Sequence, residues 1–138
     1  MNLVFKRPEI SARQFMLLLC ASLVSERKTI VDVSDITKII YNFKHEKCNP
    51  DILYIFEDIE FRAGNNNIVS SDISTSLNNM QTLGVIGRVN PSYSRIMIYL
   101  TPNEADEILA ECAEPVREAM KELANLFSTK PLYMRIQA

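Results

Sequence analysis

The longest apolar run of the chain, residues 15–24, follows a helix-capping pattern. Ser11 and Gln14 have the spacing of a capping box, which predicts a helix from Ser11 to about Glu26. Because this helix would be apolar nearly all round, we expect it in the centre of a domain or of a dimer. The run is too short to span a bilayer and follows charged residues, so we expect a cytoplasmic protein without a membrane partner.

Two further helices are predicted before residue 63. In the first, over 33–45, four apolar residues recur at the i, i+3, i+4, i+7 spacing of one helix face. In the second, over 50–62, Asn49 and Pro50 supply a cap and a first-turn proline. A brief β-branched run at 29–31 indicates a minor strand, and AGNNN at 63–67 is a loop by composition.

Residues 70–101 combine a short amphipathic helix with a two-stranded ribbon. The helix, 71–83, has an apolar inner face, and Gly84 is expected to end it in a left-handed conformation. Strands at roughly 85–89 and 95–100 flank the turn-forming sequence NPSYS. The second strand alternates apolar and polar residues, as a half-buried strand does. This order predicts a recognition helix followed by a β-hairpin wing.

The segment 102–127 reads as one long C-terminal helix with a kink at Pro115. Thr101 and Glu104 form a second capping box at its start. Apolar residues then repeat every 3.5 positions over about three heptads. Such a repeat either packs on its own domain or forms a dimer seam, and we expect the seam. Its residues would be Leu109, Cys112, Val116, Ala119, Leu123 and Leu126.

Length, net charge and the content of histidine and cysteine argue against several classes of function. A chain of 138 residues is long enough for one domain with a core, and its formal net charge of −2 gives no overall attraction to nucleic acid. The cations are concentrated in the N-terminal third. One histidine and three widely spaced cysteines predict no zinc site, no cofactor and no disulfide framework. We find no nucleophile with a recognisable base and no phosphate-cradling glycine loop, so we expect no enzymatic activity.

Several motifs in 70–110 resemble those of MarR-type transcriptional regulators, which have a winged helix-turn-helix fold. The similar features are the serine-rich helix start at 70–75, Leu77, the GVIGR sequence at 84–88, Arg95, and Leu100-Thr101 opening a helix. The resemblance implies a mainly α fold with a small β-hairpin wing, forming a single winged-helix domain over 1–138. One helix more than usual precedes the recognition helix. Either 50–62 is an insertion or 33–45 has a different role.

The resemblance implies a dimeric DNA-binding regulator of transcription. Helix 71–83 would enter the major groove of double-stranded DNA, and the hairpin over 85–100 would lie on the flanking backbone. The helix has no Lys or Arg, so a winged-helix protein–protein module without DNA affinity is the alternative. The candidate DNA-contacting residues are Ser71, Ser74, Thr75, Asn78, Asn79, Arg88, Tyr93 and Arg95.

Overall fold

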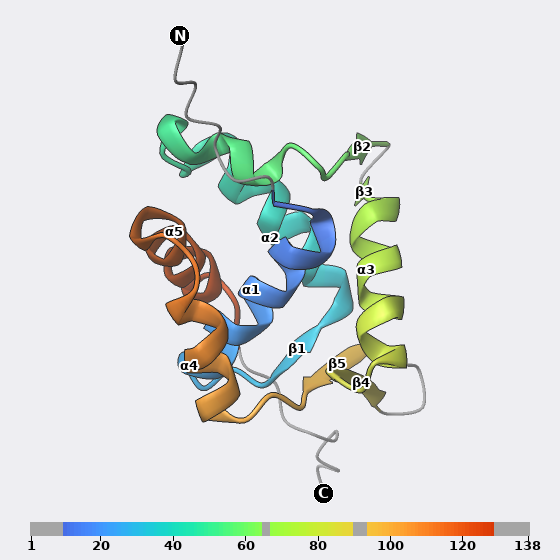
Figure 1. The fold of residues 1–138 in the computed structure, drawn as a ribbon. Helices are drawn as coiled ribbons and strands as arrows, with labels where there is room; N and C mark the ends of the chain where they lie inside the picture. The colour runs from blue at the N-terminus through green and yellow to red at the C-terminus, as the bar shows by residue number, and fades with distance from the viewer. Residues whose placement is uncertain (1–9, 65–66, 90–93, 129–138) are drawn as a thin grey trace, which may run out of the picture.

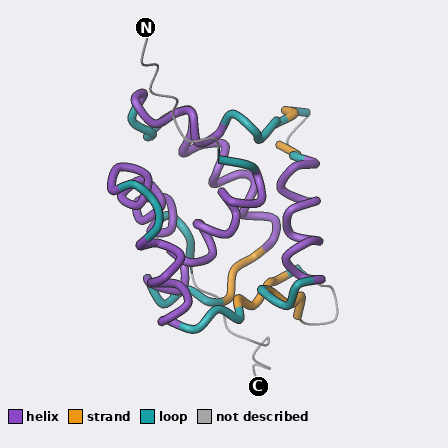
Figure 2. The backbone as a smooth tube through the Cα atoms, viewed as in Figure 1, coloured by secondary structure: helices purple, strands orange, loops and turns teal. Residues whose placement is uncertain are grey.

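The computed structural model describes residues 10–64, 67–89 and 94–128, and it is mainly helical with a small antiparallel sheet (Figures 1 and 2). Eleven elements follow one another along the described part of the chain. They are α1 (Ala12–Ser25), β1 (Ile30–Asp32), α2 (Val33–Glu46), the 3-10 helix η1 (Pro50–Phe56), β2 (Arg62–Ala63), β3 (Ile68–Val69), α3 (Ser71–Thr82), β4 (Ile86–Val89), β5 (Arg95–Ile98), α4 (Pro102–Ala110) and α5 (Glu114–Asn125).

Helix α1 occupies the centre of the molecule, with α3 on one side and α4 and α5 on the other (Figure 1). The predicted capping box is present, because Ser11 and Gln14 each bond to the backbone of the other. Neighbours on several sides explain why α1 is apolar nearly all round. In the part of the chain that the structure describes, no helix is long and apolar enough to cross a membrane.

A three-stranded antiparallel sheet closes one end of the core. Its spatial order is β1-β5-β4, so the strand that follows α1 pairs with the last strand of the hairpin. Val31 of β1 and Arg88 of β4 both lie opposite Ile96 of β5. Val31, Ile96 and Ile98 are buried, which confirms the expected alternation in the second hairpin strand.

Gly84 ends α3 as expected. Its φ of +80° is left-handed, its N–H donates to Gln81 O, and the Val85 N–H donates to Met80 O. These two bonds form a Schellman turn that directs the chain from α3 into β4. Arg27 has the equivalent position after α1, with a φ of 62°, although it carries a Cβ.

We expect Gly84→Ala to lower the free energy of unfolding by about 1 kcal/mol, because an L-residue is strained at this φ. A steric clash does not explain the loss of stability, since a Cβ on Gly84 would meet nothing within 4 Å. The matched variant Arg27→Gly removes the same strain and should not destabilise the protein. Urea denaturation measures both variants, and equal stability of Gly84→Ala and wild type would contradict the prediction.

The predicted helix over 50–62 is wrong in type and in length. Asn49 caps the segment and Pro50 begins it, but η1 is a 3-10 helix with non-helical backbone at Ile52, and it ends at Phe56. The chain then turns, and Asp58 accepts a hydrogen bond from the start of α1. Beyond it, β2 and β3 pair as a small antiparallel hairpin on either side of the expected loop, where we predicted no strand.

The single long helix expected over 102–127 is also wrong. The capping box of Thr101 and Glu104 is present, but α4 ends at Ala110 and α5 begins at Glu114. Pro115 lies in the first turn of α5, where its missing N–H breaks no helical bond. The turn between α4 and α5 allows both helices to pack against α1.

The expected dimer seam lies mostly inside the protein's own core. Val116, Ala119 and Leu123 are at most 5% exposed, and Leu109 is also buried. Cys112 is half-buried against the same core, and Leu126 alone of the six is exposed. The heptad pattern therefore reflects internal packing, which was the alternative to the seam. A homodimer stays a prediction, and its interface would need other residues.

Candidate nucleic-acid interface

Helix α3 stands along one edge of the molecule (Figure 1), and the polar side chains of one of its faces are exposed. Ile73, Leu77 and Met80 anchor its inner face and are at most 2% exposed. The five candidate residues of the outer face are all exposed, as the sequence predicts: Ser71, Ser74, Thr75, Asn78 and Asn79. Hydroxyl and carboxamide groups can bond to base edges or to phosphates, so this face has suitable groups for DNA.

Arg88 on β4 reaches back to α3. Its Nη2 donates to Asn78 Oδ1 at 2.9 Å, which joins the hairpin to the outer face of the helix. The Arg88 side chain is half-buried, and its Nε is buried without a hydrogen-bond partner among the described residues. The charge of Arg88 is therefore held beside α3 by a neutral partner.

Arg95, the other hairpin arginine among the candidates, forms an ion pair across the sheet. Strand pairing places it opposite Asp32, and Arg95 Nε lies 3.3 Å from Asp32 Oδ1. The two side chains are 14% and 25% exposed, so this ion pair is largely shielded and compensates the positive charge of Arg95. Arg95 thus ties β5 to β1, and its charge is paired with that of Asp32. Tyr93 lies outside the described residues.

Two carboxylates near the start of α3 accept hydrogen bonds from backbone N–H groups. Asp58 Oδ2 accepts from the Ala12 N–H at 2.7 Å, and Asp72 Oδ2 accepts from the Glu60 N–H at 2.8 Å. Segment 58–60 is therefore bonded both to the first residue of α1 and to the first turn of α3. These carboxylates also place negative charge near the N-terminal end of α3, where a phosphate would otherwise be favoured.

The β2–β3 hairpin lies at the opposite end of α3 from β4 and β5 (Figure 1). Its exposed Arg62 was not a candidate, because we expected that residue at the end of a helix. The glycine and asparagines between two short apolar runs were the available signal for a hairpin. A second cation, the exposed Arg13, lines an open groove together with Thr75 and Asn79.

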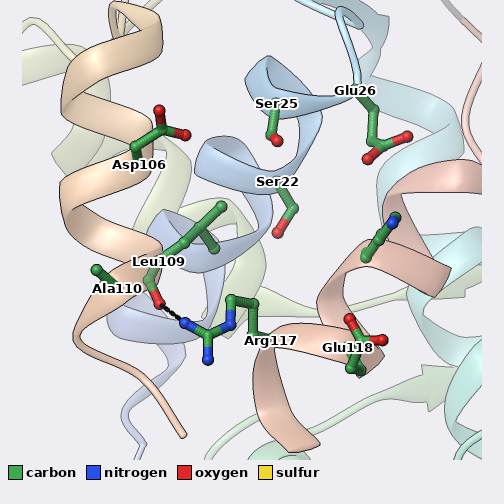
Figure 3. A pocket seen from close by; sticks show the side chains of 9 residues that line it. Ser22, Ser25, Glu26, Asp106, Leu109, Ala110, Arg117 and Glu118 are labelled. Atoms are coloured by element: carbon green, nitrogen blue, oxygen red, sulfur yellow. Dashed lines mark hydrogen bonds between the residues drawn. The ribbon is translucent and has the colours of Figure 1, made fainter. Parts of the chain in front are cut away.

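A separate hollow of about 330 Å³ lies between α1, α4 and α5 (Figure 3). Arg117 closes one side by donating from Nη1 to the Leu109 carbonyl at 3.3 Å. Carboxylates of Glu26, Asp106 and Glu118 line it together with cations. The side chains have both signs of charge and do not define one ligand, so α3 and its hairpin are the better candidate.

The three cysteines lack the properties of activated nucleophiles. Burial raises the pKa of the Cys20 thiol to about 12. The pKa values of Cys48 and Cys112 are also raised, mainly by burial, and Glu122 adds to the effect at Cys48. A higher pKa disfavours the reactive thiolate. Among the described residues, no group of three His, Cys, Asp or Glu side chains is placed to hold a metal ion.

Comparison with protein-family models, curated proteins and solved structures found no match to this chain. What the protein binds has to be inferred from the side chains and geometry of α3 and its hairpin.

Proposed function

We propose that this protein is a winged-helix DNA-binding protein that regulates transcription. The order α1, β1, α2, α3, β4, β5, with the sheet order β1-β5-β4, supports a winged-helix assignment. In that assignment η1 and the β2–β3 hairpin are an insertion between α2 and α3. Helix α3 is the recognition helix, and the hairpin of β4 and β5 is the wing.

The observation that carries the proposal is the Arg88–Asn78 bond beside the exposed polar face of α3. It places a cation next to groups that can read base edges, on a helix that itself has no Lys or Arg. In the major groove, α3 would supply base contacts and Arg88 would supply a positive charge beside them. Of the two wing arginines, Arg88 is the one without a carboxylate partner in the described part of the chain.

Binding to a random pool of duplex DNA, measured by fluorescence anisotropy at low and moderate salt, tests the proposal. Wild type should bind at micromolar concentration and weaken as salt rises. Arg88→Ala should weaken binding about ten-fold and lower the salt slope by about one. Lys121→Ala removes the same charge from an exposed position on α5 and should leave the affinity unchanged.

The second candidate function is a winged-helix protein–protein module. The compensated charge of Arg95 and the carboxylates at the start of α3 favour it, because both reduce the attraction to a polyanion. Absence of duplex binding even at low salt would overturn the DNA-binding proposal in favour of this module. A pull-down with wild type and with an α3 variant, Asn79→Arg, would then test whether the same helix face binds a protein.

A further inference from the structure

Arg88 and Asn78 form one polar unit whose geometry limits what it can bind. The Asn78 carboxamide turns its oxygen toward the guanidinium, with 2.9 Å between Oδ1 and Arg88 Nη2. The carboxamide is planar, and its NH2 group is a separate donor that the bond to Arg88 does not use. Asn78 is exposed, which leaves that NH2 group available to a ligand.

The guanidinium adds further donors. An arginine has five N–H groups and no acceptor. One of them is used on Asn78, and the N–H at Nε is buried. The remaining groups at Nη1 and Nη2 belong to a half-buried side chain at the edge of α3. Together with the Asn78 NH2 group, they present mainly hydrogen-bond donors, because one of the two lone pairs of the Asn78 oxygen already accepts from Arg88.

We infer that the Arg88–Asn78 unit selects guanine in the major groove, an inference that rests on the proposed DNA-binding function. Guanine offers two acceptors there, O6 and N7, whereas adenine offers one acceptor and one donor. A unit that is rich in donors pairs with both guanine acceptors, whereas adenine would place its N6 donor beside the donors of Arg88. A phosphate also has acceptors alone, and it is the competing source of the same chemistry.

The neighbouring Asn79 provides a matched comparison. It is exposed on the same helix face and carries the same carboxamide, but its side chain is not the one bonded to Arg88. An asparagine free to use its oxygen and its NH2 group pairs with adenine. The two adjacent asparagines therefore have different base preferences because one is bonded to an arginine and the other is not.

The test begins with selection of a preferred duplex from a random pool by wild type. Each guanine of that duplex is then replaced singly by 7-deazaguanine, which lacks the N7 acceptor but keeps Watson–Crick pairing. We expect one position at which this replacement weakens wild-type binding about ten-fold. Arg88→Ala and Asn78→Ala should bind the normal and the modified duplex equally, whereas Asn79→Ala should keep the ten-fold difference. Circular dichroism confirms that each variant is folded.

The possible results distinguish a failure of the guanine inference from a failure of the proposed DNA-binding function. If wild type binds duplex DNA but tolerates 7-deazaguanine at every position, then Arg88 does not read guanine and the inference is overturned. The DNA-binding proposal would survive that result. If wild type binds no duplex at low salt, the proposed function fails and the guanine preference fails with it.

Discussion

Phe56→Ala is expected to lower the free energy of unfolding by about 3 to 5 kcal/mol. Phe56 is fully buried, and its ring centroid lies 5.1 Å from that of Phe15 and 6.2 Å from that of Phe43. These rings join η1 to α1 and α2. Truncation would leave a cavity between three elements, and the lost contacts would not be replaced by water. Urea denaturation followed by circular dichroism measures the change.

Leu53→Ala is the matched control for Phe56→Ala. Leu53 lies in the same η1 segment but is 37% exposed, so its truncation should cost less than about 1 kcal/mol. If Phe56→Ala were as stable as wild type, the stabilising role of the Phe56 ring in the core would be contradicted. Equal losses for the two variants would show that the Phe56 ring stabilises the protein no more than the exposed Leu53 side chain does.

Leu123→Glu is expected to unfold the protein. Leu123 is 1% exposed on the face of α5 that packs into the core, so glutamate would place an unpaired charge there at a cost of several kcal/mol. The control Leu126→Glu changes the same residue type one turn later, where the side chain is 39% exposed, and should stay folded. Circular dichroism reports folding, and light scattering reports the oligomeric state of the folded proteins.

The two variants also distinguish a dimer seam from internal packing as the cause of the heptad pattern. A dimer seam on the protein surface would allow Leu123→Glu to stay folded and to become monomeric. Such a result would contradict the buried position of Leu123. Unfolding of Leu123→Glu with a folded Leu126→Glu would agree with internal packing of α5.

Elements with a strong local signal were predictable from the sequence. The capping boxes at Ser11 and Thr101 and the left-handed glycine at 84 act within a few residues, and each is present where expected. The inner face of α3 was also predictable, because a period of 3.6 separates buried from exposed positions. Local chemistry decides these features, so a single sequence is enough.

Elements that depend on distant contacts were not predictable. The apolar repeat keeps its phase from Leu109 to Leu123 even though the chain turns between α4 and α5, since both helices bury their apolar faces against α1. A heptad pattern cannot distinguish one long helix from two that share a neighbour. The η1 segment is shortened in a similar way, because Asp58 bonds to Ala12, which is 46 residues away.

The candidate interface was predictable in part. The polar face of α3 follows from its periodicity, and all five residues predicted on it are exposed. The unequal roles of the two arginines do not follow, because they depend on tertiary partners. Asp32 lies 63 residues before Arg95 and meets it only through strand pairing. No local pattern marks Arg88 as the partner of Asn78.

The two bonds of segment 58–60 have a mechanical consequence. Ala12 at the start of α1 and Asp72 in the first turn of α3 are both fastened to this short stretch of chain. Segment 58–60 therefore links the start of α1 to the first turn of α3, in addition to the direct packing of the two helices. A change in the conformation of this segment would therefore move the first turn of α3 relative to α1 while the exposed residues of α3 stay the same.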